Sequence, residues 1–234
     1  MKRSTFPMTD GMTIPVRLSR LIGMAALILA FSLPVDAQRQ RMTYNLSDLL
    51  TKKSFTVENR RISGLTEKNG VRLSADNGAG VAWINNASFS NGAIEADLRG
   101  KDIKQRSFIG IAFHGASKDD CEVIYFRPFN FHAKDSLASM HMVQYVQDTL
   151  YGWERLREEH PGVYENKLAV PPAPDDWFHV KIDVQGKAIK VYVNNEKSPS
   201  LQVTSLGTRT SGKLGLWVGN NAEGDFGNLV VAPR

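Results

Sequence analysis

The sequence predicts an all-β fold, a sandwich of two antiparallel sheets. Three observations support this prediction. Some short segments alternate apolar and polar residues with period two, others are apolar on both faces, and turn-forming residues separate them at short intervals. About a dozen such strands joined by turns are typical of a β-sandwich, here of the jelly-roll type with one structured insert.

The expected strands follow one another along the chain. Residues 92–99 alternate as a half-buried strand does, whereas residues 107–114 and 123–126 are apolar on both faces, as central strands are. Residues 177–184 and 187–193 flank a Gln-Gly turn and predict a β-hairpin. The remaining expected strands are residues 70–73, 80–84, 140–146, 200–203, 213–218 and 226–231.

One stretch, residues 148–166, breaks the strand pattern because it is long and charged and carries Trp153. Asp148 is the expected N-cap of a short helix that runs through Glu159 and ends at Pro161. A long structured insert between strands is more often functional than a plain hairpin is. The alternative to a functional insert is a segment that only packs on the sheet edge.

The first 37 residues have the features of a secretory signal peptide. Four basic residues precede the apolar run 21–31, which is too short to cross a bilayer, and small residues follow up to Ala37. We expect cleavage after Ala37 and a secreted or periplasmic bacterial protein with no membrane span after cleavage; a retained anchor is the alternative. Residues 38–53 are then an N-terminal lead-in, and residues 54–234 are the jelly-roll domain.

Composition excludes several classes of protein. The single cysteine, Cys121, excludes a disulfide framework and a cysteine-based zinc site, and its apolar neighbours indicate a buried, inert thiol. The net charge of +5 includes the basic signal segment, and lysine and arginine are scattered along the rest of the chain, so we expect no nucleic-acid partner. No phosphate-binding loop, GxSxG motif or dinucleotide turn occurs, so we expect no cofactor.

A candidate ligand site centres on Tyr125 and Arg127. Both residues have the same parity, so one face of their strand presents a phenol and a guanidinium while Ile124 and Phe126 face the other way. Aromatic rings stack on sugar faces, and arginine donates paired hydrogen bonds to hydroxyls or carboxylates. The other expected ligand-binding residues are Asn130 and His132 past the strand end, His141, Gln144 and Tyr145 on the neighbouring strand, and Trp153 and Glu154 on the insert.

An alternative interpretation gives Arg127 a structural role. An arginine in an otherwise apolar strand must find a partner, and pairing with Glu122 or Glu154 would hold the insert in place.

Several segments resemble concanavalin A-like lectin and glucanase domains. They are residues 89–99, 108–114, 125–131, 212–218 and 225–229. Within that group the chain, from about Ser54 to Val231, looks most like secreted bacterial domains of the laminin G-like or 3-keto-disaccharide hydrolase-like kind. The resemblance implies two antiparallel sheets, one of them concave, with sugars handled on the concave face.

The resemblance also implies a test for glucanase chemistry. Retaining glucanases of this group carry three acids on one strand, the outer two serving as nucleophile and general acid. Glu95 and Asp97 match the first half of that motif, but Arg99 and Gly100 occupy the positions of the third acid. Glu95 and Asp97 are therefore expected on the solvent face of a strand, and glucanase chemistry of this kind is disfavoured.

The function expected from these observations is recognition of a glycan by an exported binding domain, with no catalytic residue assigned. One alternative is a glycoside hydrolase resembling the 3-keto-disaccharide hydrolases. Its acid/base would be Glu122, Glu154 or Glu158, with His132 or His141 assisting. A second alternative is a scaffold or adhesion domain whose insert binds a protein partner that the sequence does not name.

No metal site is predicted, because the histidines lack zinc-ligand spacing. Calcium is the one ion the sequence leaves open, with Asp119, Asp120 and Asp225 as oxygen donors.

Overall fold

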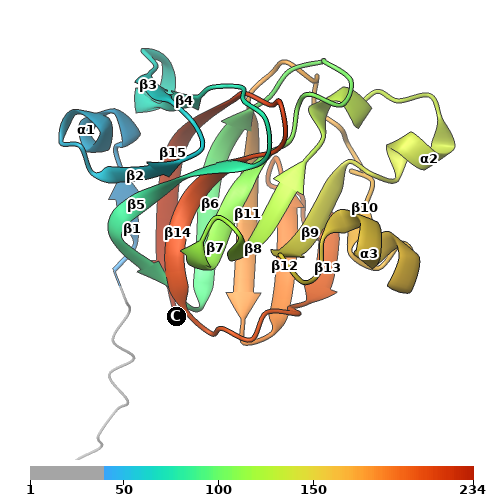
Figure 1. Cartoon of the computed structure of the whole chain (residues 1–234). Coiled ribbons are helices and arrows are strands. Elements are labelled where there is room, and N and C mark those ends of the chain that lie inside the picture. Colours follow the sequence, from blue (N-terminus) through green and yellow to red (C-terminus); the bar gives the residue numbers. More distant parts are fainter. Residues whose placement is uncertain (1–39) are drawn as a thin grey trace, which may run out of the picture. The chain divides into compact units, whose positions relative to one another are not determined.

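The computed structural model describes residues 40–234 and confirms the two-sheet sandwich (Figure 1). The sheet that we call sheet A runs in the order β13 (Leu201–Thr204), β12 (Ala188–Val193), β11 (Phe178–Gln185), β6 (Gly92–Arg99), β15 (Gly224–Pro233), β4 (Val71–Leu73) and β3 (Ile62–Gly64), with β1 (Met42–Tyr44) also paired to β15. Sheet B runs in the order β10 (Glu165–Asn166), β9 (Val143–Asp148), β8 (Asp120–Phe126), β7 (Ile109–Ser117), β14 (Gly212–Val218), β5 (Gly80–Phe89) and β2 (Phe55–Glu58). All pairings are antiparallel among these strands.

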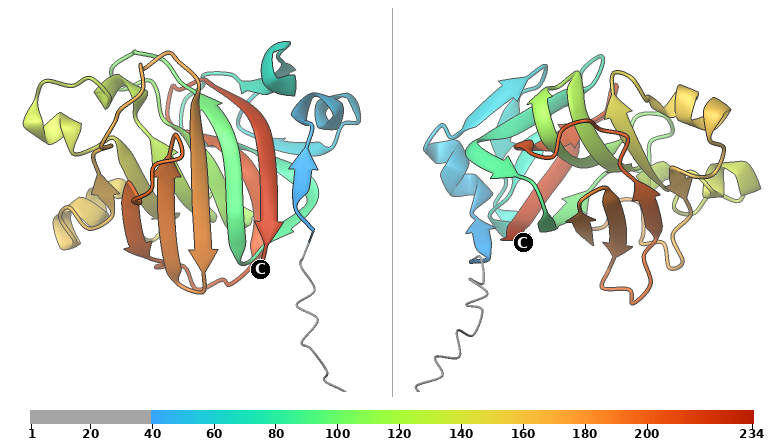
Figure 2. Two further views of the ribbon diagram at one scale, coloured as in Figure 1. Left: turned by 180° about the vertical axis from the view of Figure 1, so that it is seen from behind. Right: turned by 90° about the horizontal axis from the view of Figure 1, so that it is seen from below.

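The hydrophobic core lies between the sheets, which Figure 2 shows as two layers. Strand β11 illustrates the cause: Phe178, Val180, Ile182 and Val184 are buried while the residues between them are not, because successive side chains point to opposite faces. Phe178 meets Phe126 of sheet B with ring centroids 5.2 Å apart. Edge-to-face contacts of this kind stabilise the sandwich beyond the area that they bury.

A buried ionic cluster also lies on the inner face of sheet B. Glu122 accepts hydrogen bonds from Tyr145 Oη (2.5 Å) and faces His114 Nδ1 at 2.8 Å. Burial acts to raise the pKa of Glu122, but hydrogen bonds from His114 and Tyr145 outweigh it and lower that pKa. Glu122 is thus occupied inside the sandwich.

The predicted signal peptide, residues 1–37, lies outside the described residues. The expected lead-in that follows it contributes to the sandwich: β1 pairs with β15, and helix α1 (Leu46–Thr51) buries Leu46 completely. Asn45 caps this helix by accepting a hydrogen bond from the Asp48 amide. No helix among residues 40–234 has the length and apolar character needed to cross a membrane.

The structure corrects the expected start of the helix in the insert. Asp148 does not cap a helix; it ends β9 and pairs with Cys121 of β8. A tight turn follows, in which the backbones of Gln147 and Tyr151 exchange both hydrogen bonds, so helix α3 (Trp153–Glu159) begins only after Gly152. Its end at Glu159 agrees with the prediction.

The strand expected over residues 140–146 is likewise shifted. Helix α2 (Ser136–Ser139) and a turn occupy the residues before Val143, where β9 begins. His141 therefore lies in a turn and not on the strand. Two short 3₁₀ helices, η1 (Glu67–Asn69) and η2 (Pro128–Asn130), complete the described elements.

Glu95 and Asp97 lie on the outer face of sheet A, as expected. Asp97 accepts hydrogen bonds from Lys68 Nζ (2.8 Å) and Asn228 Nδ2 (2.7 Å), and its Oδ1 lies 2.9 Å from His179 Nδ1. Burial acts to raise the pKa of Asp97, but these hydrogen bonds outweigh it and lower the pKa to about 2. The hydrogen bond to Asp97 raises the pKa of His179. These carboxylates therefore stabilise the sheet surface.

The Asp97–His179 pair predicts a pH-dependent contribution to stability. A pKa raised by folding contributes stability that is complete below the unfolded value of about 6.5 and is lost as pH rises through the folded value. The substitution His179→Gln should therefore lower the free energy of unfolding by about 1 kcal/mol at pH 5 and by much less at pH 9. Urea unfolding at both pH values measures this, with Lys181→Gln on the same strand as the control; a larger loss at pH 9 would contradict it.

Candidate functional site

The outer face of sheet B carries the candidate site. Across the strands, Tyr125 of β8 pairs with Gln144 of β9 and with Gly110 of β7, and Gly110 pairs in turn with Trp217 of β14. Paired residues of antiparallel strands point to the same face. Tyr125, Gln144 and Trp217 are therefore neighbours on one face, and the Tyr125 and Trp217 ring centroids lie 5.2 Å apart.

A buried polar cluster lies around Tyr125. Arg127 Nη2 donates to Tyr125 Oη (2.5 Å) and to Gln144 Oε1 (2.5 Å), and Tyr125 Oη donates to Gln144 Oε1 (3.2 Å). Arg127 Nη1 reaches the carbonyl oxygen of His141 (3.3 Å), which also accepts from Asn130 Nδ2 (3.1 Å). The cluster joins β8 to β9 and to the turn before β9.

Arg127 is therefore a structural residue in this arrangement. It is only 5% exposed, and its guanidinium carbon lies 4.8 Å from the Tyr125 ring centroid. Burial lowers the pKa of Arg127 and raises that of Tyr125, since both charged forms lose hydration. The internal partners of Arg127 differ from those expected: Glu122 lies on the other face of β8, and Glu154 is exposed on α3.

A second layer of contacts fixes helix α3 against the sheet. Glu165 of β10 pairs with Gln144, and its carboxylate accepts two hydrogen bonds from Arg157 Nε and one from Nη2, between 2.8 and 3.0 Å long. The Arg157 guanidinium carbon lies 4.8 Å from the Trp153 ring centroid. Since Arg157 is held by Glu165, it sets the position of the Trp153 indole, which is 45% exposed.

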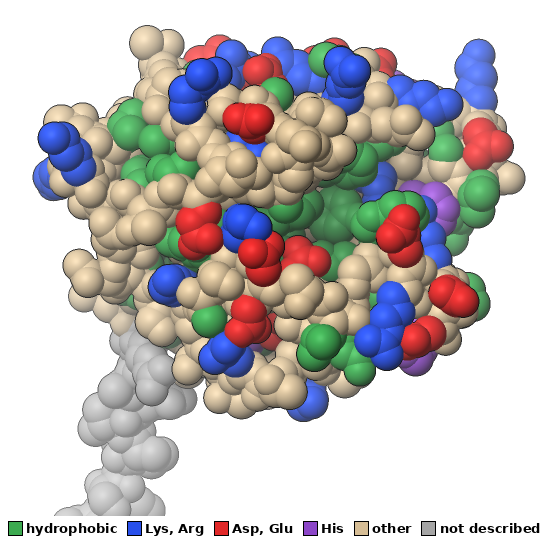
Figure 3. All heavy atoms as spheres, viewed as in Figure 1, with side chains coloured by type: hydrophobic (Ala, Val, Ile, Leu, Met, Phe, Trp, Pro, Cys, Tyr) green, Lys and Arg blue, Asp and Glu red, His purple; other side chains and the backbone are tan. Residues whose placement is uncertain are grey.

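These elements surround a pocket of about 230 Å³ on the outer face of sheet B, which we call the aromatic pocket. Figure 3 shows a hollow in this face with hydrophobic side chains inside it. The pocket is smaller than the roughly 300 Å³ at which pockets for drug-sized ligands begin, so it suits a single ring. Its lining residues are Ala79, Phe108, Tyr125, Val146, Asp148, Gly152, Trp153, Trp217, Gly219 and Asn220.

The rim opposite α3 is formed by loops that Arg60 ties together. Its Nη2 donates to the carbonyl oxygens of Gly78 (2.6 Å) and Gly219 (2.7 Å). The Gly78 amide donates to Asn220 Oδ1 (2.7 Å). Two loops far apart in sequence are thus held side by side at the pocket, and Asn220 is exposed there.

Of the residues predicted from sequence, Tyr125 and Trp153 line the aromatic pocket, and Gln144 and Arg127 support Tyr125. Others do not join them. Tyr145 lies on the inner face, where its hydroxyl binds Glu122. His132, Glu154 and Glu158 are exposed, and none of them lines the aromatic pocket.

His141 does not line the aromatic pocket, and its Nδ1 lies 2.6 Å from Glu165 Oε2. Burial and the nearby positive charge of Arg157 lower the pKa of His141, although the carboxylate of Glu165 acts to raise it.

The expected calcium donors are dispersed. Asp225 accepts from both Arg72 and Arg99, while Asp119 pairs with Lys118 and Asp120 with Arg209. Within residues 40–234, no three His, Cys, Asp or Glu side chains gather as a metal-binding group. The thiol of Cys121 is buried, and burial raises its pKa.

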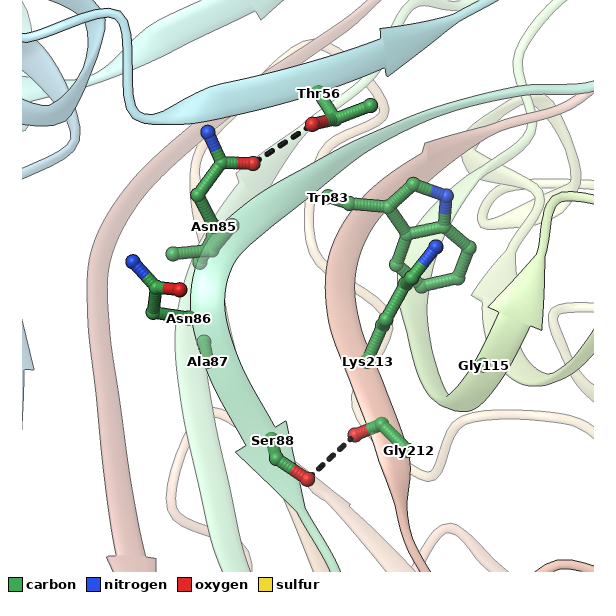
Figure 4. A pocket seen from close by; sticks show the side chains of 10 residues that line it. Thr56, Trp83, Asn85, Asn86, Ala87, Ser88, Gly115, Gly212 and Lys213 are labelled. Carbon is green, nitrogen blue, oxygen red and sulfur yellow. Dashed lines mark hydrogen bonds between the residues drawn. The ribbon is translucent and has the colours of Figure 1, made fainter.

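A larger pocket of about 700 Å³ lies beside β5 and β14 (Figure 4). Its aromatic residue, Trp83, is 1% exposed, because its ring lies on Gly115 and Gly215 and Lys213 Nζ covers it at 5.9 Å from the ring centroid. A side-chain carbon at Gly115 would lie 2.3 Å from that ring. Trp83 offers no free ring face, so the aromatic pocket is the better candidate for a ligand.

Sequence reasoning missed four features of the aromatic pocket: Phe108, Asp148, Trp217 and the Gly219–Asn220 turn. A signal for Asp148 was available, because Gln144, Val146 and Asp148 share parity on one strand. Trp217 depends on the order of strands in the sheet, which a single sequence does not state.

Comparison with solved structures finds the same sandwich. The carbohydrate binding module CBM66 from Bacillus subtilis superposes with a TM-score of 0.56 at 17% identity, covering 76% of this chain and 95% of the module. A galectin-like protein of unknown function from Bacillus subtilis gives 0.55 at 14% identity, over 82% and 94%. The carbohydrate recognition domain of Emp46p gives 0.51 at 13% identity, over 80% and 92%.

The described domain therefore has a concanavalin A-like jelly-roll fold, as the sequence resemblance implied. No protein-family model matches the chain, and a search of curated proteins finds no match.

The cluster around Arg127 makes a prediction about stability. The substitution Arg127→Leu leaves Tyr125, Gln144 and the His141 carbonyl without their buried donor and should lower the free energy of unfolding by about 3 kcal/mol. The control Arg155→Leu removes an exposed arginine that pairs with Glu159, donates to the Leu150 carbonyl oxygen and lies over the Tyr151 ring, and it should cost far less than Arg127→Leu. Urea unfolding compares them, and equal stability of Arg127→Leu and the unsubstituted protein would refute the structural role.

Proposed function

We propose that the protein is an exported carbohydrate-binding domain that holds one sugar ring of a glycan in the aromatic pocket. One observation carries the proposal: four aromatic side chains converge on a single pocket, namely Phe108 from the loop before β7, Tyr125 from β8, Trp153 from α3 and Trp217 from β14. Sugar rings present apolar C–H faces that pack on aromatic rings, while their hydroxyls need polar partners. Asp148 and Asn220 supply polar groups in the same pocket.

The names of the similar structures support this choice. Two of the three proteins compared above are described as a carbohydrate binding module and a carbohydrate recognition domain. The expected signal peptide supports export, since an exported domain meets glycans outside the cytoplasm.

The pocket favours binding over hydrolysis. Glycoside hydrolysis generally uses two carboxyl groups on either side of the scissile bond. Among the described residues, Asp148 is the one side chain with a carboxyl group that lines the aromatic pocket. The acids considered from sequence lie elsewhere, since Glu122 is occupied inside the sandwich and Glu154 and Glu158 are exposed on α3.

Trp153 provides the direct test because it is the most exposed ring of the pocket. The substitution Trp153→Ala should weaken glycan binding at least about tenfold, because it removes one aromatic wall while leaving the floor intact. Screening on a glycan array with and without calcium, followed by calorimetry with the strongest binder, measures the effect.

The matched control is Trp177→Ala, which removes an indole directly before β11, away from the aromatic pocket, where the Arg99 guanidinium carbon lies 4.6 Å from the Trp177 ring centroid. It should bind glycan as the unsubstituted protein does. Absence of binding to every glycan, or equal binding by Trp153→Ala, would contradict the proposed function. Release of reducing sugar would show that the domain is a hydrolase.

A further inference from the structure

The aromatic pocket contains one acidic side chain, that of Asp148. Asp148 is the last residue of β9 and is half-buried, with its side chain on the face that carries Gln144 and Val146. Among residues 40–234, no group donates a hydrogen bond to its carboxylate. A half-buried carboxylate needs donors, and in this pocket they can come from a ligand or from water.

The cations near the pocket are already engaged. No Lys, Arg or His is among the lining residues. Arg127 donates to Tyr125, Gln144 and His141, Arg157 binds Glu165, and Lys118 pairs with Asp119. The charge that a ligand meets in the pocket is therefore that of Asp148.

The pocket floor adds an unused hydrogen-bond donor. Trp217 is 6% exposed, and its Nε1 is buried without an acceptor among the described residues. Asn220 uses its oxygen to accept from the Gly78 amide, and its own amide nitrogen finds no acceptor among residues 40–234. Unsatisfied polar atoms at a pocket indicate a missing partner. Together with Asp148 they match a ligand that both donates and accepts, as sugar hydroxyls do.

We infer that the aromatic pocket takes an uncharged sugar whose hydroxyls donate to Asp148, and that it rejects sugars carrying a carboxylate or sulfate on the bound ring. The inference rests on the proposed function and names the class of sugar. It opposes the expectation from overall charge, because the chain after the predicted cleavage site still carries 25 Lys and Arg against 22 Asp and Glu, and a net positive protein attracts anionic polymers in general.

The charge state of Asp148 gives the selectivity a pH dependence. Burial raises the pKa of Asp148 to about 6, and the neighbouring Asp119 adds to this shift while Lys118 opposes it. Cys121, the residue paired with Asp148 on β8, has a thiol whose pKa burial also raises. At pH 8 Asp148 is ionised and repels an anionic sugar, whereas at pH 5 it is mostly protonated and repels it less.

The experiment compares hexasaccharides that differ in one group. The probes are the neutral hexamers of glucose, mannose and galactose and the matching hexamers of glucuronate, mannuronate and galacturonate, tested by calorimetry at pH 8 and pH 5. Uronates stay ionised at both values. Whichever neutral hexamer binds, we expect its affinity at pH 8 to be at least tenfold higher, roughly, than that of the matching uronate hexamer. At pH 5 we expect the ratio of the two affinities to be smaller.

Two variants identify the group responsible. Asp148→Asn should weaken binding of the neutral hexamer about tenfold, remove most of the discrimination and abolish its pH dependence. Asp176→Asn, which makes the same charge change at an exposed position, should behave as the unsubstituted protein does. If Asp148→Asn fails to fold, the comparison of neutral and uronate binding at pH 5 and pH 8 in the unsubstituted protein still tests the inference.

Each outcome bears on a defined claim. Preference for a uronate that depends on Trp153 would overturn the inference and leave the proposed function standing. Unchanged discrimination in Asp148→Asn, or discrimination that is equal at pH 5 and pH 8, would also overturn it. Binding of no hexamer at all, neutral or anionic, would contradict the inference, and the array with Trp153→Ala then decides the proposed function separately.

Discussion

The buried guanidinium of Arg127 is the interaction on which the candidate site depends. A charge taken out of water must be compensated by hydrogen bonds, and Arg127 finds them in Tyr125, Gln144 and the His141 carbonyl. Because these partners belong to β8, β9 and the turn before β9, satisfying one charge fixes three segments at once. The Tyr125 ring that forms part of the pocket floor is held by the same contacts.

The pocket has two sides that are built differently. On the insert side, Glu165 holds Arg157 and Arg157 holds Trp153, so an ion pair positions an exposed aromatic wall. On the opposite side, Arg60 ties two loops through their carbonyl oxygens and leaves Asn220 at the rim. Three arginines thus serve the site by holding other groups, and the charge presented inside the pocket is that of the acid Asp148.

Strand parity explains what could be predicted. Alternation placed Tyr125 and Arg127 on one face and Ile124 and Phe126 on the other, and the structure confirms both, since the geometry of a strand leaves no other choice. It also separates Gln144 from Tyr145, although the sequence prediction placed both in the site. The partners of Arg127 were not predicted, because they depend on the register of β8 against β9 and on the turn that brings His141 close. Trp217 is 92 residues from Tyr125 in sequence, and only the order β8-β7-β14 brings the two rings together.

The indole N–H signals of the four tryptophans test the central claim most directly, because the structure places two of them in the aromatic pocket and the other two at separate sites. Trp153 and Trp217 line the aromatic pocket, Trp83 lies under Lys213, and Trp177 lies directly before β11 of sheet A, beside Arg99. In ¹⁵N-labelled protein titrated with neutral hexasaccharides of glucose, mannose and galactose, the Trp153 and Trp217 signals should shift together while those of Trp83 and Trp177 stay in place. Shifts of Trp83 or Trp177 with Trp153 and Trp217 unmoved would place the ligand elsewhere and contradict the account.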